Sequence, residues 1–358
     1  MLCMILVSCT GQKTGKENDN NDKIAIEVGE IKFPPQDVLQ LKSYYLSSSV
    51  HVDSIDYLIG YNYRLHSLDC MNLKSKSVTQ IVLPGDGPDA IVRLSGIYAQ
   101  SLDSVWISDE SERAFLIDSV GTIKRMIDLK KYLEDQEQLL INTNYAMFTS
   151  HLFYNASRHS LMFLVKHTPS NTFIVKEVFI DEVGKMATYQ LSSSKVVPDM
   201  SKGYAYINFP NVNFVGENIV YNYPVESSIY MLDIRTNERK YILADSHYTS
   251  NIIEKCTTSG DYATLEKHWL ENSHFYDIMY LPKYKIYARL HADKVDFDEK
   301  KGMEKLINER DLYLMLFDEN MEKIGETKLS NCRYSPFTSW NATYGGIALF
   351  VDNVLDEK

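Results

Sequence analysis

One pattern recurs five times along this chain of 358 residues, and it restricts the fold more than any other feature. An apolar, alternating segment ends in Asp, a short polar stretch follows, and a second alternating segment ends in Leu. Alternation with a period of two on both sides of a turn is typical of a β-hairpin. The copies span residues 65–83, 114–129, 177–191, 229–243 and 314–329.

Each copy has turn-forming residues at its centre. An Asp side chain can accept hydrogen bonds from the backbone just after it, and Gly or Asn tolerates positive φ. We therefore assign the aligned aspartates to turns rather than to catalysis. These aspartates are Asp69, Asp118, Asp181, Asp233 and Asp318. The expected positive-φ residues are Gly121, Gly184 and Asn237.

The segments before each hairpin also repeat, which makes the unit three or four antiparallel strands. Successive aspartates lie 49 to 85 residues apart. Repeats of this length with several strands each are the signature of a β-propeller, in which blades stack around an axis to bury their faces. We predict an all-β, six-bladed propeller, with seven blades as the alternative. A β-sandwich is disfavoured because it would not repeat so long a unit.

Three segments interrupt the repeat. Residues 261–274 and 129–140 have apolar residues at helical spacing and predict short helical insertions. Residues 293–310 form a charged insertion, and from Asp296 and Asp298 onward its sequence starts like a calcium-binding loop. It has Lys301 and Ile307 where that loop needs Gly and a bidentate Glu. We therefore predict a solvated loop there.

The last repeat, at residues 333–353, lacks its own closing hairpin. The alternating segment near the N-terminus can supply the missing strand and so remove exposed sheet edges. We predict a single propeller domain over residues 24–358, closed by an N-terminal strand at residues 24–33 that is the outer strand of the last blade.

The first residues predict export. The segment Leu2–Val7 is largely apolar. Ser8 and Cys9 follow it, and a polar stretch comes next. The order Leu-Val-Ser-Cys resembles the bacterial lipobox, in which an acylated cysteine becomes the first mature residue. We therefore expect residues 1–8 to be a signal-peptide remnant and residues 9–23 a lipidated, disordered tether anchored at Cys9.

Composition excludes some classes of function. The net charge is -11, which disfavours nucleic acid because phosphates need a basic surface. The dispersed histidines and cysteines make no metal pattern, and no hydrolase or nucleotide motif occurs, so we predict no metal, cofactor or recognisable catalytic residue. The spacing of Cys70, Cys256 and Cys332 leaves open whether two of them form a disulfide.

Aromatic residues between the repeats are the candidate ligand-binding residues. A propeller gathers the loops between blades around one mouth of its channel, and Tyr, Trp and Arg are typical of sites that bind sugars, peptides or protein surfaces. The candidates are Tyr145, Tyr204, Tyr206, Arg333, Tyr334 and Trp340. Gly85 and Gly87 lie in "PGDGPD", which could hold a ligand but more simply makes a turn between blades with positive φ.

With the lipobox at Cys9, the turn "LPGDGPDAI" (83–91) and the stretch "SLDSVWISD…FLIDSVGTIKRMIDL", the chain resembles the TolB/NHL-like six-bladed β-propeller lipoproteins of Bacteroidetes, specifically a family of unknown function. The resemblance implies a lipid-anchored protein of the outer membrane, on its periplasmic or surface side.

We expect a monomeric, non-catalytic binding or scaffolding module for a glycan, a peptide or a partner protein. It would meet the membrane through its lipid anchor only and would not bind nucleic acid. The alternative is a propeller hydrolase or lyase whose site converges at the channel mouth. A cluster of His and carboxylates there would favour the enzyme, and an aromatic mouth would favour binding.

Overall fold

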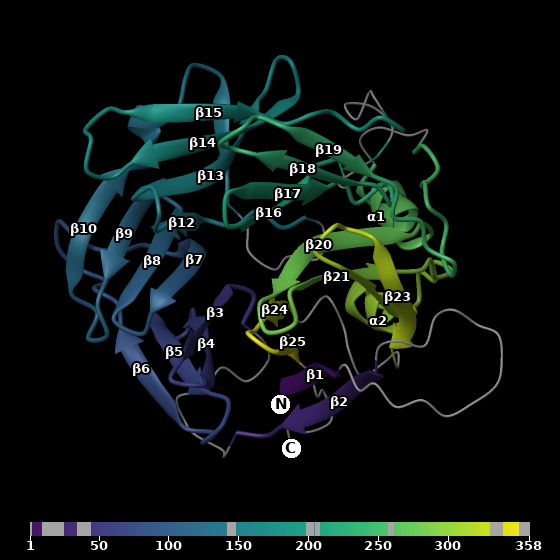
Figure 1. The fold of residues 1–358 in the computed structure, drawn as a ribbon, viewed down its shortest axis with the longest axis horizontal. Coiled ribbons are helices and arrows are strands. Elements are labelled where there is room, and N and C mark those ends of the chain that lie inside the picture. The colour runs from purple at the N-terminus through teal and green to yellow at the C-terminus, as the bar shows by residue number, and fades with distance from the viewer. Residues whose placement is uncertain are drawn as a thin grey trace.

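The computed structural model describes residues 2–8, 25–33, 44–141, 148–197, 204, 208–256, 261–329 and 339–350. Within these residues the strands form six antiparallel sheets around a common axis (Figure 1). The sheets are arranged as the blades of a propeller, and the predicted all-β propeller class is confirmed. The described strands form no seventh sheet, which the seven-bladed alternative would need.

Five sheets are made of consecutive strands. The first contains β3 (Ser47–Val52), β4 (Ile55–Asn62), β5 (Ser67–Asn72) and β6 (Val78–Val82). The second contains β7 (Leu94–Ser101), β8 (Ser104–Asp109), β9 (Arg113–Ile117) and β10 (Ile123–Asp128). The third contains β11 (Glu137–Leu140), β12 (Phe153–Asn155), β13 (Ser160–His167), β14 (Thr172–Phe179) and β15 (Met186–Gln190), and both β11 and β12 pair with β13.

The fourth sheet contains β16 (Asn211–Val215), β17 (Asn218–Asn222), β18 (Ile229–Asp233) and β19 (Arg239–Ile242). The fifth contains β20 (His274–Leu281), β21 (Ile286–Ala292), β22 (Leu312–Phe317) and β23 (Lys323–Leu329). In each of the five sheets one strand lies nearest the axis: β3, β7, β12, β16 and β20 (Figure 1).

The remaining sheet combines the two ends of the described chain. Its order is β24 (Trp340–Ala342), β25 (Gly346–Phe350), β1 (Leu2–Ser8) and β2 (Ala25–Ile31). Strand β2 is therefore the outermost strand of this composite sheet, but it pairs with β1 and not with β25. Residues 2–8, which the sequence assigns to a signal-peptide remnant, take the place between them. The domain boundaries stay predictions.

The middle strands of the sheets are buried on both faces. Every position of β21 and β22 is buried, whereas β10 exposes Lys124, Arg125 and Met126. Neighbouring sheets pack face to face, so a middle strand has no side in contact with water. Its sequence is mostly apolar, and the charged residues that it contains, such as Arg289 and His291 of β21, are buried. The outer strands lie at the rim of the ring and keep polar residues on one side.

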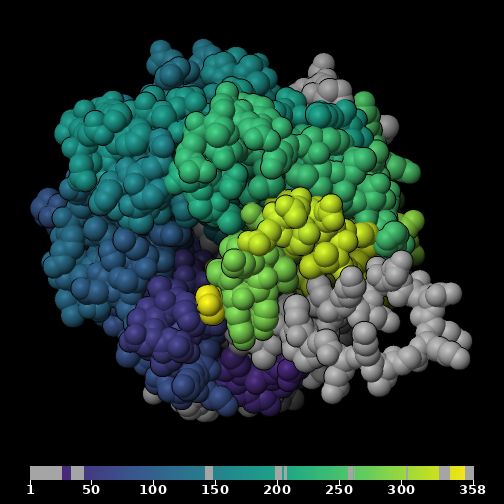
Figure 2. Space-filling model, in the orientation of Figure 1, coloured from purple at the N-terminus to yellow at the C-terminus, as the bar shows by residue number. Residues whose placement is uncertain are grey.

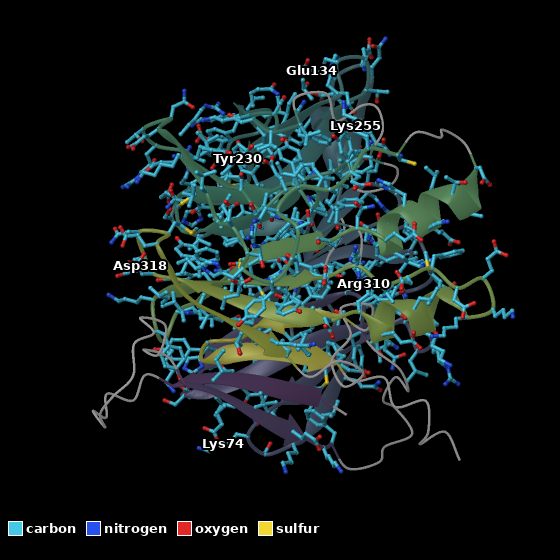
Figure 3. The ribbon with its side chains drawn as sticks, turned by 90° about the vertical axis from the view of Figure 1, so that its right-hand side faces the viewer. Lys74, Glu134, Tyr230, Lys255, Arg310 and Asp318 are labelled. Carbon is cyan, nitrogen blue, oxygen red and sulfur yellow. The ribbon has the colours of Figure 1, made fainter. Side chains whose placement is uncertain are left out.

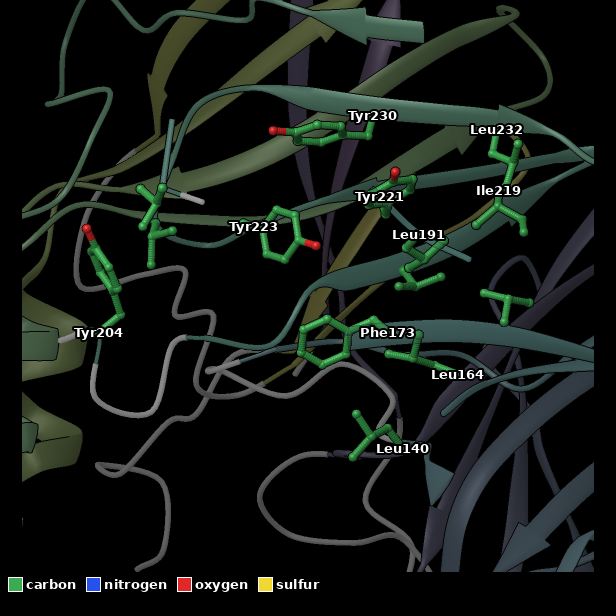
Figure 4. Close-up of a cluster of buried hydrophobic side chains, with 14 of the residues drawn as sticks. Leu140, Leu164, Phe173, Leu191, Tyr204, Ile219, Tyr221, Tyr223, Tyr230 and Leu232 are labelled. Carbon is green, nitrogen blue, oxygen red and sulfur yellow. The ribbon is translucent and has the colours of Figure 1, made fainter. Parts of the chain in front are cut away.

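Tyrosines connect neighbouring sheets. The rings of Tyr221 and Tyr230 stack 5.1 Å apart in the largest core cluster, which joins the third and fourth sheets (Figure 4). Their hydroxyl groups accept hydrogen bonds from the backbone N–H groups of Ser192, at 2.9 Å, and Lys195, at 2.8 Å. A buried tyrosine therefore adds packing area and also satisfies a polar backbone group between sheets.

The turns of three hairpins have the expected hydrogen bonds. Asp118 accepts from the N–H groups of Val120 and Thr122, Asp233 from two N–H groups and Asp318 from two more. The structure places the three expected residues in positive φ: Gly121, Gly184 and Asn237. Asp181 also lies in a turn, where its carboxylate contacts Arg125 at 3.0 Å.

Two predicted turn positions are wrong. Asp69 lies inside β5, fully buried, and accepts hydrogen bonds from Tyr44 and Gln80. The turn after β5 is made by Asn72, whose side-chain oxygen accepts from two following N–H groups. An asparagine can replace aspartate in this role. The residue of the first repeat that corresponds to the other turn aspartates is therefore Asn72, three residues after Asp69. Gly87 has φ +92°, but Gly85 is not among the positive-φ glycines.

The helical insertions are partly as predicted. Helix α1 (Tyr262–Leu270) begins at Asp261, whose carboxylate accepts from the Thr264 N–H. The charged insertion contains α2 (Met303–Glu309), which the sequence assigned to a loop. Residues 129–140 are not a helix: a 3₁₀ turn, η1 (Leu129–Tyr132), precedes strand β11, because pairing with β13 outweighs weak helical preference. Both α-helices lie on the same face of the ring, at the right of Figure 3.

Candidate functional site

A pocket of about 380 Å³ lies on the propeller axis. Residues from the strand nearest the axis in every sheet line it, so β3, β7, β12, β16, β20 and β24 all contribute. Gly216, Pro282 and Tyr344, from the turns after three of these strands, lie at its rim. Figure 2 shows a hollow at the centre of this face, beside the hairpin between β20 and β21. We call this space the channel pocket.

One wall of the channel pocket is a row of aromatic rings. Tyr98 from β7 meets Phe153 from β12 edge-on, with centroids 5.1 Å apart. Phe153 stacks on Phe214 from β16 at 5.0 Å, with 12° between the ring planes. We call these three residues the aromatic row. The three rings come from the innermost strands of three successive sheets and form a continuous apolar surface.

A polar cluster lines the same pocket. The Asp277 carboxylate on β20 is 2% exposed and accepts a 2.8 Å hydrogen bond from Trp340 Nε1 on β24. Its other oxygen lies 3.4 Å from His151 Nε2, on the segment before β12. The His151 side chain is 17% exposed. We call these residues the His151–Asp277–Trp340 cluster, and it places a buried acceptor and a partly accessible imidazole beside the aromatic row.

The wall formed by β3 is rich in serine. Ser48 Oγ accepts from the Ala99 N–H at 3.0 Å, and Ser49 Oγ donates to the Ala342 carbonyl. Asn341 Nδ2 donates to the Ser47 carbonyl at 3.0 Å. These bonds connect the first sheet to the second sheet and to the composite sheet. They hold the pocket wall in place, and the hydroxyl groups of Ser48 and Ser49 bond to backbone groups of neighbouring sheets.

The polar groups of the channel pocket bond to one another and to neighbouring backbone. Nucleophilic catalysis needs a hydroxyl or thiol in hydrogen-bond contact with a base. Within the described residues His151 contacts Asp277, and the serine hydroxyls described above bond to backbone groups instead. The described part of the chain also contains no group of three His, Cys, Asp or Glu that could hold a metal ion. Its helices are all too short or too polar to cross a membrane.

The sequence-predicted ligand residues have different fates. Trp340 lines the channel pocket but is fully buried, and it serves the site by binding Asp277. Tyr204 is 4% exposed and belongs to the core cluster of the third and fourth sheets (Figure 4), so it is a packing residue. The other candidates lie outside the described residues: Tyr145, Tyr206, Arg333, Tyr334 and the predicted anchor Cys9.

The most important pocket residues carry no signal in the sequence. His151 ends a segment that the sequence marked for its aromatics, but Phe153, Phe214 and Asp277 lie in alternating strands that look like ordinary core. Only their placement nearest the axis separates them from packing residues. Among the cysteines, Cys70 is a buried thiol, and burial followed by the nearby Asp69 charge raises its pKa to about 12. That thiol is inert at neutral pH.

Comparisons with known proteins agree with this fold. The sequence pattern of a family described as "Domain of unknown function (DUF4221)" matches residues 17–328. A crystal structure of a DUF4221 member from Bacteroides vulgatus has a TM-score of 0.70 at 13% identity, covering 90% of this chain and 95% of that chain. A Bacteroides fragilis protein described as a presumed exported protein has a TM-score of 0.48 at 12% identity, covering 83% and 74%.

No match was found among curated proteins. The structural likeness at 13% identity shows a shared fold and nothing of function. The family match is different in kind, because it covers most of the sequence from the polar N-terminal stretch to the end of β23. This chain therefore belongs to the DUF4221 family, a domain of unknown function with a propeller fold.

Proposed function

We propose that this protein is a non-catalytic binding module of the bacterial cell envelope whose channel pocket holds a neutral saccharide. The observation that carries the proposal is the aromatic row beside the His151–Asp277–Trp340 cluster. The pocket has the size of a small-molecule site, mainly apolar walls and a few polar groups that can set orientation.

The walls suit the two kinds of surface on a sugar ring. A pyranose presents C–H groups on its faces, and these carry partial positive charge that the negative face of an aromatic ring attracts. Its rim carries hydroxyl groups that need donors and acceptors. The aromatic row supplies the first surface, and His151 and Asp277 supply the second. Rings already packed against each other lose little conformational entropy when a ligand binds.

Charge supports a neutral ligand rather than an acidic one. The titratable side chains among the described lining residues are Asp277, His51, His151 and three tyrosines, and none is Lys or Arg. An acidic sugar or a phosphate needs a fixed positive partner in a buried site. A negative ligand would also lie beside the Asp277 carboxylate, and this repulsion would select against it.

Binding titrations by calorimetry test the proposal, with a panel of neutral mono- and oligosaccharides and their acidic counterparts. We expect affinity for a neutral member, a loss of at least about tenfold in Phe153→Ala, and no change in Phe179→Ala. Phe179 is the matched control, because it is also half-buried and lies in the same sheet at the outer end of β14. Tight binding of acidic sugars alone would contradict the proposal, as would equal losses in the two variants.

The enzyme remains a second candidate because His151 in the pocket lies beside the Asp277 carboxylate. A carboxylate that orients an imidazole is a component of many acid–base sites. In this case a saccharide bound by the wild type would be converted to product, and Asp277→Asn would keep binding while losing turnover. Chromatography of the ligand after long incubation distinguishes the two functions, since a binding module returns it unchanged.

Location and closure are part of the same proposal. The lipobox-like Leu6–Cys9 segment and the polar stretch after it support a lipid anchor at Cys9, as in the TolB/NHL-like lipoproteins. In that arrangement residues 1–8 are cleaved and β1 is lost with them, so we infer that β2 moves into the place of β1 beside β25 and completes the sixth blade. The monomer meets protein or glycan partners outside the membrane. Labelling with an acyl-chain analogue should mark the wild type and not Cys9→Ser, and equal labelling of both would contradict the anchor.

A further inference from the structure

Three fully buried polar side chains on the helical side of the fifth sheet each keep one atom without a partner. His274 and Tyr276 belong to β20, and Arg310 follows α2. They are 0%, 1% and 3% exposed. The unpartnered atoms are His274 Nε2, the Tyr276 hydroxyl oxygen and Arg310 Nη1. Buried polar groups are almost always hydrogen-bonded, so three exceptions among neighbouring side chains need a common explanation.

The three side chains form one cluster. His274 and Tyr276 are alternate residues of a strand and lie on the same side of it, with ring centroids 4.6 Å apart. The Arg310 guanidinium lies 5.8 Å from the centre of the Trp269 ring, and that ring meets His274 edge-on at 6.1 Å. Trp269 is part of α1, so the cluster joins β20 to both helices. Figure 3 shows Arg310 in the interior between them.

All three unpartnered groups can donate a hydrogen bond, and the Tyr276 hydroxyl can also accept one. Trp269 Nε1 donates to His274 Nδ1 at 3.1 Å, so the neutral imidazole carries its proton on Nε2. Burial, followed by the Arg310 charge, holds the pKa of His274 well below its usual range and keeps the ring neutral. Arg310 Nε donates to the Asp293 carbonyl at 2.7 Å, and Nη2 donates to the Asn272 carbonyl at 2.6 Å. Nη1 therefore remains without a hydrogen-bond acceptor.

The charge of the cluster is unbalanced. Arg310 makes no ion pair within the described residues, and Asp293 accepts from it through its backbone carbonyl rather than its carboxylate. A buried cation without an ion pair is costly. Burial lowers the pKa of Arg310, and Tyr276 and the nearby Asp293 charge offset it only partly. One negative charge with acceptor capacity for three donors would satisfy every group at once.

We propose that His274, Tyr276 and Arg310 bind a small monovalent inorganic anion, such as chloride, and that this anion holds the two helices against the fifth sheet. The single positive charge selects a monovalent ion over phosphate. The donors come from a strand and from the end of a helix, so the bound ion connects β20 to helices that also share a core cluster through Leu270 and Leu306. None of the three side chains lines the channel pocket, although the Tyr276 ring meets the pocket residue Trp340 edge-on with centroids 5.1 Å apart.

The test combines crystallography and thermal unfolding of the purified protein. Crystals grown in sodium bromide should show an anomalous peak within hydrogen-bond distance of all three donors. In solution, replacing gluconate by chloride at constant ionic strength should raise the Tm by about 2 °C or more, because a ligand of the folded state alone stabilises it.

Variants make the result specific. Tyr276→Phe removes one donor with little change of shape and should weaken the apparent chloride affinity about tenfold. Tyr313→Phe is the matched control, since Tyr313 is 5% exposed on β22 of the same sheet and lies outside the cluster, so its chloride response should equal that of the wild type. Arg310→Met should abolish the response if the variant folds.

Four results would overturn the proposal. Water in place of bromide, direct hydrogen bonds among the three side chains in the crystal, or a Tm that depends on ionic strength but not on the identity of the anion would each show that no anion site exists. An equal chloride response in Tyr276→Phe and the wild type would place any bound ion elsewhere. Failure of the channel pocket to bind saccharides has no bearing on these outcomes.

Discussion

Trp340 Nε1 donates a 2.8 Å hydrogen bond to Asp277 Oδ1, across 63 positions of sequence. The bond joins β24 of the composite sheet to β20 of the fifth sheet. On the other side of β24, Asn341 Nδ2 donates to the Ser47 carbonyl at 3.0 Å and so reaches β3 of the first sheet. Adjacent residues of one short strand therefore connect the composite sheet to both neighbours, at the wall of the channel pocket.

The first prediction concerns this bond. Trp340→Phe removes the donor to a buried carboxylate, and we expect the free energy of unfolding to fall by about 2 kcal/mol beyond the loss of packing. Trp106→Phe is the control, because Trp106 is also fully buried but its Nε1 has no partner. Urea denaturation of both variants measures the difference. Equal losses would show that the hydrogen bond contributes nothing.

The second prediction concerns a glycine in the second hairpin. Gly121 has φ +84°, and a Cβ there would lie 2.3 Å from the Val82 carbonyl oxygen of the neighbouring sheet. Gly184 has φ +78°, but a Cβ added there would have no other atom within 4 Å. We expect Gly184→Ala to cost about 1 kcal/mol and Gly121→Ala at least about twice that, because only the second adds a collision to the backbone strain. Thermal denaturation distinguishes them, and similar Tm values would contradict a tight contact between these sheets.

The third prediction concerns acid stability. Burial alone would raise the pKa of Glu326, but hydrogen bonds from His291, Ser246 and the His247 N–H outweigh it and lower the pKa from 4.5 to about 2. The ionised carboxylate therefore contributes stability that is present above the unfolded-state pKa and is lost as the pH falls from 4.5 through about 2.

We expect wild-type stability to decline over that interval and the decline to be shallower in Glu326→Gln, which should also be less stable at pH 7 by about 2 kcal/mol. Glu182→Gln, at an exposed turn, should follow the wild-type curve. Denaturant titrations at a series of pH values give the measurement. If Glu326→Gln and the wild type have parallel curves below pH 4.5, the carboxylate does not titrate with unfolding.

The fourth prediction concerns closure of the ring. Deleting residues 25–31 removes the outermost strand of the composite sheet, and we expect a sharply lower Tm and lower solubility because a sheet edge is uncovered. Deleting residues 1–8 is the comparison. If that deletion leaves the Tm unchanged, β2 can close the sheet without β1. If deletion of 25–31 has no effect, the ring is closed by other contacts.

Turn chemistry explains why the hairpins could be predicted. Asp118, Asp233 and Asp318 act on backbone groups within four residues, so the signal is local and survives in the sequence. The prediction that Asp69 forms a turn is wrong because Asn72 binds the turn backbone instead. Asp69 lies within the strand and accepts a hydrogen bond from Gln80. The helix predicted at residues 129–140 is wrong for a different reason. Strand β11 pairs with β13, which begins twenty residues after β11 ends, so the interaction that decides its structure is not local.

By itself, the sequence determined the all-β class, the repeated hairpins, the positive-φ turns at Gly121, Gly184 and Asn237 and the helix at Tyr262–Leu270. These features depend on alternation and on side chains that bond to nearby backbone. Only the tertiary structure decided which aromatic and polar residues face the axis. Phe153, Phe214 and Asp277 line one pocket because separate sheets place their innermost strands around the propeller axis. These residues are up to 124 positions apart, and they come together only in the closed ring, so no periodic pattern in the sequence marks them.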